Sequence, residues 1–199
     1  MNSLAFLLEY INKPRSTGAL LPSSPKLAEH MTAAIDFQTA EYIIEYGPGT
    51  GVFTEKLIHK RRNGTRILLI EQNEVFCRLL KDKYGDVKDL VIVNGSAENT
   101  SYYMKKYGFK RADYILSGLP FASIPSDAAD LILSETASIL GAEGEFITFQ
   151  YTLFKKALFK RYFSAIRVSR EYQNLPPAYV LACTNGERNE SFAFKRISR

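Results

Sequence analysis

One short segment in the first half of the chain constrains the fold more than any other feature. The apolar stretch that ends in Ile43-Ile44-Glu45-Tyr46 runs directly into Gly47-Pro48-Gly49-Thr50-Gly51, and a helical pattern follows. Glycines let a backbone turn sharply and approach a ligand where a Cβ atom would collide. The spacing is G-x-G-x-G, which differs from the G-x-G-x-x-G of dinucleotide sites. A strand, a tight glycine turn and a helix predict an α/β fold with a ligand at the carboxyl end of that strand.

The following residues repeat this alternation of short apolar segments and amphipathic ones. We expect strands over residues 42–46, 66–70, 90–93, 113–117 and 145–151. We expect helices over residues 26–35, 52–60, 74–83, 100–107 and 127–140. In the last of these helices the predicted buried residues are Ala128, Leu131, Ile132, Ala137 and Leu140. Such alternation is typical of βαβ units that build a parallel sheet covered by helices on both faces.

The pattern changes after residues 154–162. Residues 165–170 and 179–184 are predicted strands, and the Asn174-Leu175-Pro176-Pro177 connection between them is too short for a crossover helix. Two such strands pair antiparallel. The expected fold is therefore a Rossmann-like α/β fold with a mostly parallel, seven-stranded sheet and a C-terminal antiparallel hairpin. We expect a helical segment over residues 1–40 that closes over the site, and a ligand-binding domain over residues 41–199.

Charge and composition narrow the classes of partner. Residues 151–199 hold ten Lys and Arg against three Glu, whereas the 199-residue chain as a whole carries a net charge of +5. A basic end on a near-neutral body favours an anionic partner, either nucleic acid or anionic lipid. Cys77 and Cys183 are far apart, as are the two histidines, so we expect no metal site, no disulfide framework and a cytoplasmic location. No apolar run approaches the length that spans a bilayer.

Two acidic residues point to the kind of cofactor. Glu45 places a carboxylate at the end of the first strand, where it would repel a pyrophosphate and attract a cationic amino-acid group. Glu71 ends the second strand, 20 residues after Gly51, a position suited to accepting hydrogen bonds from ribose hydroxyls. S-adenosylmethionine has an ammonium, a sulfonium and a ribose but no phosphate, and it is the expected cofactor.

Several segments together resemble one enzyme family. They are residues 17–24, 45–51, 117–121, 149–151 and 174–178, of which Gly-Ala-Leu-Leu-Pro-Ser-Ser, Ser-Gly-Leu-Pro and Asn-Leu-Pro-Pro-Ala are the most specific. The chain resembles the bacterial phospholipid N-methyltransferases, which methylate phosphatidylethanolamine, and more distantly the ribosomal RNA adenine dimethyltransferases. Both are class I S-adenosylmethionine-dependent methyltransferases. The resemblance implies that Pro22–Ser24 closes over the cofactor and that residues 117–121 face the acceptor.

These arguments give two sets of candidate site residues. The expected cofactor-binding residues are Ser23, Ser24, Glu45, Tyr46, Gly47, Gly49, Gly51, Glu71, Gln72, Ser96, Ala97 and Ser117. The expected residues at the reacting centre are Ser117, Gly118, Leu119, Pro120 and Phe121. Ser96 stands where many class I members carry an aspartate that contacts adenine, so the serine or nearby Glu98 would have to serve. No side chain is assigned as general base. The Ser117 hydroxyl and the backbone carbonyls of Ser117 and Gly118 are candidate hydrogen-bond acceptors for the amine, and Phe121 and Tyr151 are candidate aromatic faces for a cation.

The acceptor is expected to be a phospholipid amine at an anionic membrane surface. The RNA dimethyltransferases carry an asparagine at the position of Gly118, and glycine offers no side chain to grip an exocyclic amine. They also have a helical RNA-binding domain after the catalytic one, and we expect no such domain here. The amphipathic segment 4–11 and Lys155, Lys156, Lys160 and Arg161 would bring the enzyme peripherally to the inner face of the cell membrane. RNA, a small soluble acceptor and a non-catalytic cofactor-binding module remain the alternatives.

Overall fold

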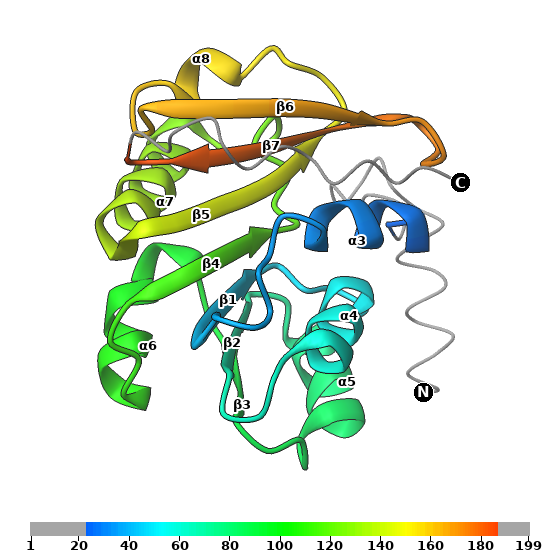
Figure 1. Cartoon of the computed structure of the whole chain (residues 1–199), viewed down its shortest axis with the longest axis vertical. Helices are drawn as coiled ribbons and strands as arrows, with labels where there is room; N and C mark the ends of the chain where they lie inside the picture. The colour runs from blue at the N-terminus through cyan, green and yellow to red at the C-terminus, as the bar shows by residue number, and fades with distance from the viewer. Residues whose placement is uncertain (1–22, 187–199) are drawn as a thin grey trace.

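The computed structural model describes residues 23–186, which form a seven-stranded sheet with helices on both faces (Figure 1). The strands are β1 (Tyr42–Tyr46), β2 (Arg66–Glu71), β3 (Leu90–Asn94), β4 (Ala112–Ser117), β5 (Leu140–Gln150), β6 (Ala165–Glu171) and β7 (Ala178–Thr184). The helices are α3 (Pro25–Thr32), α4 (Val52–Lys60), α5 (Glu74–Tyr84), the 3₁₀ turn η1 (Ala97–Asn99), α6 (Thr100–Tyr107), α7 (Ser126–Ile139) and α8 (Lys156–Phe159). The predicted segment 4–11, Pro22 and the last residues of the basic end lie outside the described residues.

The order of the strands is β3-β2-β1-β4-β5-β7-β6, and the predicted topology is confirmed. Strands β1 to β5 pair in parallel, and β7 runs antiparallel to both β5 and β6. Because β6 therefore points the same way as β5, the turn between β6 and β7 lies at the carboxyl edge of the sheet. The glycine loop after β1 lies at the same edge, so the hairpin contributes to the edge where open α/β sheets bind ligands.

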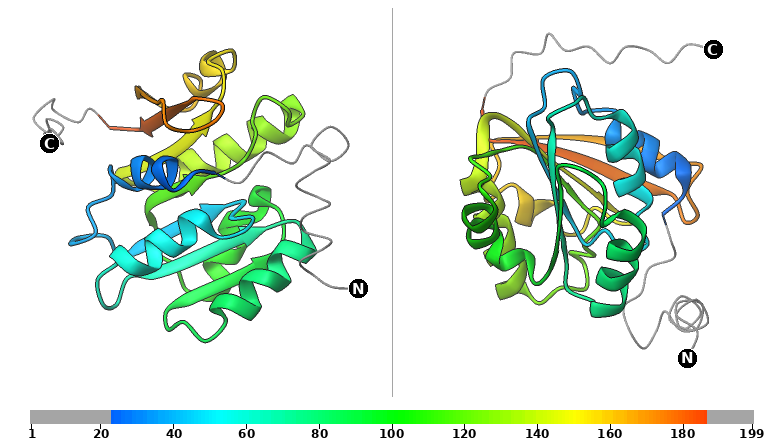
Figure 2. Two further views of the ribbon diagram at one scale, coloured as in Figure 1. Left: turned by 90° about the vertical axis from the view of Figure 1, so that its right-hand side faces the viewer. Right: turned by 90° about the horizontal axis from the view of Figure 1, so that it is seen from below.

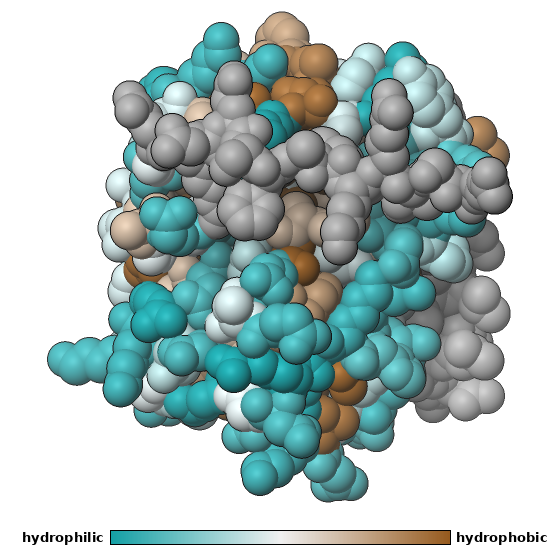
Figure 3. Space-filling model, in the orientation of Figure 1, coloured by the Kyte–Doolittle hydropathy of each residue, from teal (hydrophilic) through white to brown (hydrophobic). Residues whose placement is uncertain are grey.

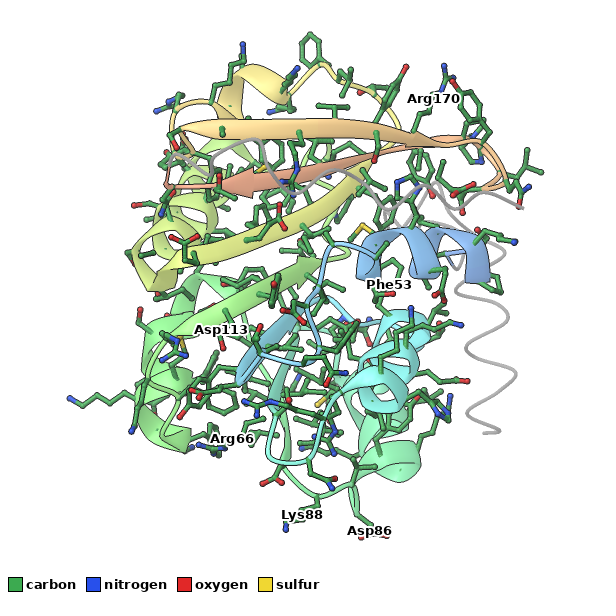
Figure 4. The ribbon with its side chains drawn as sticks, in the orientation of Figure 1. Phe53, Arg66, Asp86, Lys88, Asp113 and Arg170 are labelled. Atoms are coloured by element: carbon green, nitrogen blue, oxygen red, sulfur yellow. The ribbon has the colours of Figure 1, made fainter. Side chains whose placement is uncertain are left out.

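Two apolar layers pack on the two faces of the sheet (Figure 2). Alternate residues of β1 supply both layers: Ile43 faces α3, α4 and α5, whereas Ile44 and Tyr46 face α6, α7 and α8. In Figure 4, Phe53 of α4 lies below α3, and its ring packs edge-on against Phe149 at 5.9 Å between centroids. Burial from both sides explains why the central strands read as continuous apolar runs rather than alternating ones.

The buried face of α7 differs from the prediction. Leu131 is 59% exposed, Ala128, Ala137 and Leu140 are half-buried, and Ile132 alone of the five is buried as expected. The helix packs with the stripe Ala129, Ile132, Leu133 and Thr136, which has the i, i+3, i+4, i+7 spacing of a helical face. The apolar residues of this segment fit two neighbouring stripes, and packing on the sheet selects between them. The helix also ends earlier than predicted, at Ile139, because β5 begins at Leu140.

None of the helices within residues 23–186 is long and apolar enough to cross a membrane.

Candidate functional site

The glycine loop between β1 and α4 is built from left-handed backbone conformations. Gly47, Gly49 and Gly51 have φ angles of +61°, +55° and +85°, which side-chain-bearing residues rarely adopt. The Gly47 amide donates to the carbonyl of Ile70 at 2.9 Å, which fastens the loop to β2. No described atom lies within 4 Å of the place where a Cβ on Gly49 would stand. The loop therefore leaves open space beside the backbone of Gly49.

The loop after β4 presses against the glycine loop. The Gly118 amide donates to the carbonyl of Tyr46 at 2.9 Å, and a Cβ on Gly118 would lie 2.8 Å from the Gly47 carbonyl oxygen. A Cβ on Gly47 would in turn lie 3.0 Å from a methyl group of Leu119. A side chain at position 118 would therefore displace backbone. This contact is a structural reason for glycine where the RNA dimethyltransferases carry asparagine.

Glu45 is fully buried beneath the glycine loop. Its Oε2 accepts a hydrogen bond of 2.7 Å from the Thr54 hydroxyl, and its Oε1 has no hydrogen-bond partner among residues 23–186. Burial raises the pKa of this carboxyl to about 8. A buried carboxylate with one unpartnered oxygen is costly unless a cation or a donor reaches it. This site fits the ammonium group of S-adenosylmethionine.

Glu71 lies at the end of β2 and is also buried. Its Oε2 accepts from the Gly49 amide at 2.9 Å and its Oε1 from the Asn73 amide at 2.8 Å. Burial raises the pKa of this carboxyl as well. Each carboxylate oxygen can accept a further hydrogen bond, so both remain suited to ribose hydroxyls. Gln72 beside it is exposed.

The region after β3 places Ser96 at the start of η1. The Ser96 hydroxyl accepts from the Glu98 amide at 3.3 Å, Ala97 is buried, and the Glu98 side chain is exposed. The Asn94 side chain donates to the carbonyls of Glu71 at 2.9 Å and Gln72 at 3.1 Å. The ends of β2 and β3 are thereby tied together, so Glu71 and Ser96 belong to one continuous edge.

The residues expected at the reacting centre divide into two groups. Ser117 is buried at the end of β4, where its hydroxyl accepts from the Leu119 amide at 3.2 Å and its carbonyl accepts from Thr148 at 3.3 Å. Leu119 and Pro120 are half-buried beside the glycine loop. Phe121 is fully buried and packs against Phe159 at 5.2 Å between ring centroids. The turn after Pro120 thus directs the Phe121 ring into the core, and its expected role at the acceptor stays a prediction.

Three residues absent from the predicted set complete this edge. Thr54 holds Glu45, and nothing in its sequence context marks it. Gln150 lies at the end of β5 and donates from Nε2 to the Leu119 carbonyl at 3.3 Å. Asn174 accepts from the Ser24 amide at 3.1 Å and donates to the Pro176 carbonyl at 2.8 Å. Gln150 and Asn174 fall within segments that carried the family resemblance, and that resemblance was the signal for them.

The N-terminal side of the site is fastened to the hairpin. The Ser24 hydroxyl caps α3 by accepting from the Leu27 amide at 3.1 Å, and Ser23 beside it is half-buried. The ring of His30 lies between Glu171 and Ser169 of β6, with N···O distances of 3.1 and 2.8 Å. Tyr151 is half-buried, and burial raises the pKa of its hydroxyl. Ser23, Ser24 and Tyr151 therefore lie at the same edge as the glycine loop.

Among residues 23–186, no group of three His, Cys, Asp or Glu side chains is arranged to hold a metal ion.

Comparisons with known proteins show which proteins share this fold. The chain is 26% identical over 180 residues to an ornithine lipid N-methyltransferase from Singulisphaera acidiphila, covering 89% of this chain and 93% of that protein. It superposes on the O-methyltransferase from Bacillus cereus solved in complex with SAH, with a TM-score of 0.64 and 11% identity over 92% of this chain and 90% of the other. The chain has the class I methyltransferase fold. The expected resemblance to class I methyltransferases is confirmed.

Two further similarities cover less of the other protein. A probable ribosomal RNA small subunit methyltransferase A from Methanosarcina barkeri is 29% identical over 94 residues, which is 47% of this chain and 29% of that protein. The structure of TrmN from Thermus thermophilus gives a TM-score of 0.60 and 14% identity over 87% of this chain, which spans about half (52%) of TrmN. No family model matches the chain. The methyltransferase fold is therefore shared widely, and the acceptor must be inferred from the site.

Proposed function

We propose that this chain is an S-adenosylmethionine-dependent N-methyltransferase that methylates the amine of a lipid headgroup at a membrane surface. The observation that carries the proposal is the carboxyl edge itself. It combines a buried carboxylate with an unpartnered oxygen, an open glycine loop, and a β4 loop in which Gly118 has no room for a side chain. The similarity to an ornithine lipid N-methyltransferase over nearly the whole of both chains supports a lipid amine as acceptor.

The residues of this edge would hold the cofactor in a defined way. Glu45 would receive the ammonium, the backbone of the glycine loop would lie against the amino-acid part, and Glu71 would accept from the ribose hydroxyls. Ser96 and Ala97 would border the adenine. When bound, the cofactor supplies an electrophilic methyl group on its sulfonium.

The chain's own task at the acceptor is positioning and proton removal. An alkyl amine is protonated near neutral pH and must lose a proton before its lone pair can attack. Desolvation lowers the pKa of such an amine, and a hydrogen-bond acceptor orients it. The candidate hydrogen-bond acceptors are the backbone carbonyls of Ser117 and Gly118 and the Ser117 hydroxyl, which accepts from the Leu119 amide and has a second lone pair. Gln150 fixes the carbonyl of Leu119 and so supports this loop.

The family resemblance of residues 17–24, 117–121 and 174–178 favours phosphatidylethanolamine as the lipid that is methylated. The name of the relative suggests an ornithine lipid instead. The second candidate acceptor is an RNA amine, because half of the chain is similar to a probable ribosomal RNA methyltransferase. The contact of Gly118 with Gly47 argues against it, since no side chain at position 118 can grip a base.

The test is a transfer assay with methyl-labelled cofactor on total lipid, phosphatidylethanolamine liposomes and ribosomal RNA transcripts in parallel. We expect label in the lipid fraction and none in RNA. The Glu71→Gln variant should lose most of this activity, whereas Glu74→Gln, three residues away on the exposed first turn of α5, should retain it. Label in RNA alone, or none in lipid while the cofactor is bound, would refute the proposal.

A further inference from the structure

Large apolar side chains are exposed on two loops at the carboxyl edge. Within residues 23–186, six large hydrophobic side chains are exposed, and four of them are Leu153, Phe154, Tyr172 and Leu175. Phe154 is 86% and Leu175 83% exposed. In Figure 3, apolar side chains also gather at the top of the view, around α8 and the loop that leads into it. Single exposed leucines are ordinary, but several large apolar side chains on loops that leave a ligand-binding edge indicate an interaction surface.

Strand register brings the two loops to the same edge. Gln150 at the end of β5 pairs with Tyr179, and Tyr179 pairs with Arg170 near the end of β6. The loop of residues 151–155 and the hairpin tip, defined here as residues 172–177, therefore both leave the edge that carries the glycine loop.

Hydrogen bonds hold the backbone of the hairpin tip, and its apolar side chains are exposed. Asn174 is 4% exposed and bonds both Ser24 and Pro176, whereas its neighbour Leu175 projects outward. Glu171, just before the tip, holds the ring of His30 on α3. Contacts on both sides thus fix the backbone of the tip and leave Tyr172 and Leu175 in solvent.

Basic residues are frequent in the segment that joins the two loops. Residues 151–171 contain six Lys and Arg and a single acid, Glu171. Arg161 and Arg167 pair with Asp130 and Glu145, which lie outside that stretch. The Arg170 guanidinium lies over the rings of Tyr172 and Tyr179, 5.0 and 5.1 Å from their centroids, and Figure 4 places it beside the tip. Cations next to projecting apolar groups match an anionic bilayer, which offers phosphates outside and acyl chains beneath.

We propose that the hairpin tip is a membrane anchor, in which Tyr172 and Leu175 enter the boundary between headgroups and acyl chains of an anionic bilayer. Arg170 and the lysines after β5 contact headgroup phosphates, and the carboxyl edge with its glycine loop turns toward the lipid. The anchor rests on the proposed function and adds the surface by which the site reaches its acceptor. Leu153 and Leu175 have no face on which a base can stack, whereas the rings of Phe154 and Tyr172 do, so an RNA oligonucleotide is the competing ligand in the test.

The chain contains no tryptophan, which permits a direct test. Leu175→Trp introduces a single probe at the tip, and Leu131→Trp places a matched probe at another exposed leucine, on α7. Each full-length variant is mixed, in the presence of methyl-labelled S-adenosylmethionine, with vesicles of equal parts phosphatidylethanolamine and phosphatidylglycerol, with vesicles that also carry brominated acyl chains, and with an RNA oligonucleotide. The emission of the Leu175→Trp variant should shift to the blue and be quenched by the brominated lipid, and that of Leu131→Trp should not change.

The binding of a second pair of variants to the anionic vesicles gives an independent measure of the contribution of the tip. Leu175→Asp should bind the anionic vesicles roughly tenfold more weakly than the wild type, and Leu131→Asp should bind them equally well. Equal emission changes for both tryptophan probes, no change for either, or a response of the tip to RNA in place of vesicles would overturn the anchor.

Methyl transfer to lipid, assayed in the same samples, separates the two proposals. Transfer to lipid while the tip probe stays in water would refute the anchor and leave the proposed function standing. Insertion of the tip without any methyl transfer would support the anchor and refute the proposed function.

Discussion

Glu45 shows how much the role of one residue depends on its surroundings. As part of the sequence it is an acid before a glycine loop, which attracts a cation. In the structure it is fully buried, holds the Thr54 hydroxyl and keeps one oxygen unpartnered, and its pKa rises to about 8. A cationic cofactor would favour the ionised form, so its binding below pH 8 must release a proton.

Cofactor affinity should therefore rise with pH between about 5.5 and 7.5, by up to roughly tenfold per unit. Glu45→Gln should weaken binding roughly ten- to hundredfold at the upper end of this range and flatten the dependence. Calorimetry with S-adenosylmethionine in buffers of different ionisation enthalpy measures both the affinity and the released proton. Glu55→Gln, an exposed acid on α4, is the matched control.

The raised pKa of Glu45 makes the stability of the ligand-free protein fall with pH, whereas cofactor affinity rises. A folded-state pKa above the unfolded value makes the ligand-free protein lose stability as pH rises from about 4.5 to about 8. The Glu45→Gln variant should be more stable than the wild type at pH 8.5 in thermal unfolding, although it binds the cofactor less well. The affinity prediction has a clear contrary outcome. If cofactor affinity depends on pH in the Glu45→Gln variant as it does in the wild type, then Glu45 does not face the ammonium.

At the scale of elements, α3 and the β6–β7 hairpin depend on one another. Helix α3 is short, with eight residues from Pro25 to Thr32, and helices of this length gain their stability from packing rather than from propensity. Its start is held by Asn174, and its last turn by the contact of His30 with Glu171 and Ser169. The hairpin is thus the support that keeps α3 at the carboxyl edge.

Asn174→Ala should release the start of α3 and destabilise the chain by about 1–3 kcal/mol, because buried groups lose their partners. Hydrogen exchange should accelerate at the amides of Leu27 and Ala28, which bond to Ser24. Asn185→Ala is the control, since Asn185 also bonds a backbone carbonyl, that of Ala137, with its side chain exposed to solvent. Unchanged exchange in α3 would mean that the helix is held by its apolar face alone.

At the scale of the whole molecule, exposed apolar side chains and a positive charge lie at the same edge of the sheet as the glycine loop. The carboxyl edge collects the glycine loop, the exposed apolar residues of two loops and Arg170, while the lysines after β5 follow directly along the chain. Surface charges act over roughly 10 Å at about 0.1 M salt, so these cations sense an anionic surface together. The molecule as a whole would thus be oriented toward lipid before any headgroup enters the site.

Binding to anionic vesicles should therefore weaken steeply as salt rises from about 0.05 M to about 0.5 M, since each Lys or Arg near the surface contributes about 1 kcal/mol. Co-sedimentation measures this. The double variant Lys155→Gln, Lys156→Gln should reduce both the binding and its salt dependence. The matched pair Lys105→Gln, Lys106→Gln, in the last turn of α6, should change neither. Salt-independent binding to neutral vesicles would exclude an electrostatic role.

Most elements of the fold follow from the sequence. Residues 42–46, 52–60 and 100–107 form the predicted strand and helices with the predicted bounds. The errors arise where two patterns compete locally, as at Leu131, which fits one of two possible stripes of α7, and at Leu140, where a helix passes into a strand. The proline-containing connection after residue 171 was enough to predict the antiparallel hairpin, because no crossover helix fits within it.

By itself the sequence determined the alternation of strands and helices, the glycine loop after β1 and the presence of an acid at the end of β1 and of β2. These are local patterns, written in residues a few positions apart. Only the tertiary structure decided that Glu45 is buried against Thr54, that Gly118 presses on Gly47, that Phe121 turns into the core and that Asn174 holds α3. Apart from the short reach from Glu45 to Thr54, these contacts join residues tens of positions apart, and only the packed sheet brings their partners together.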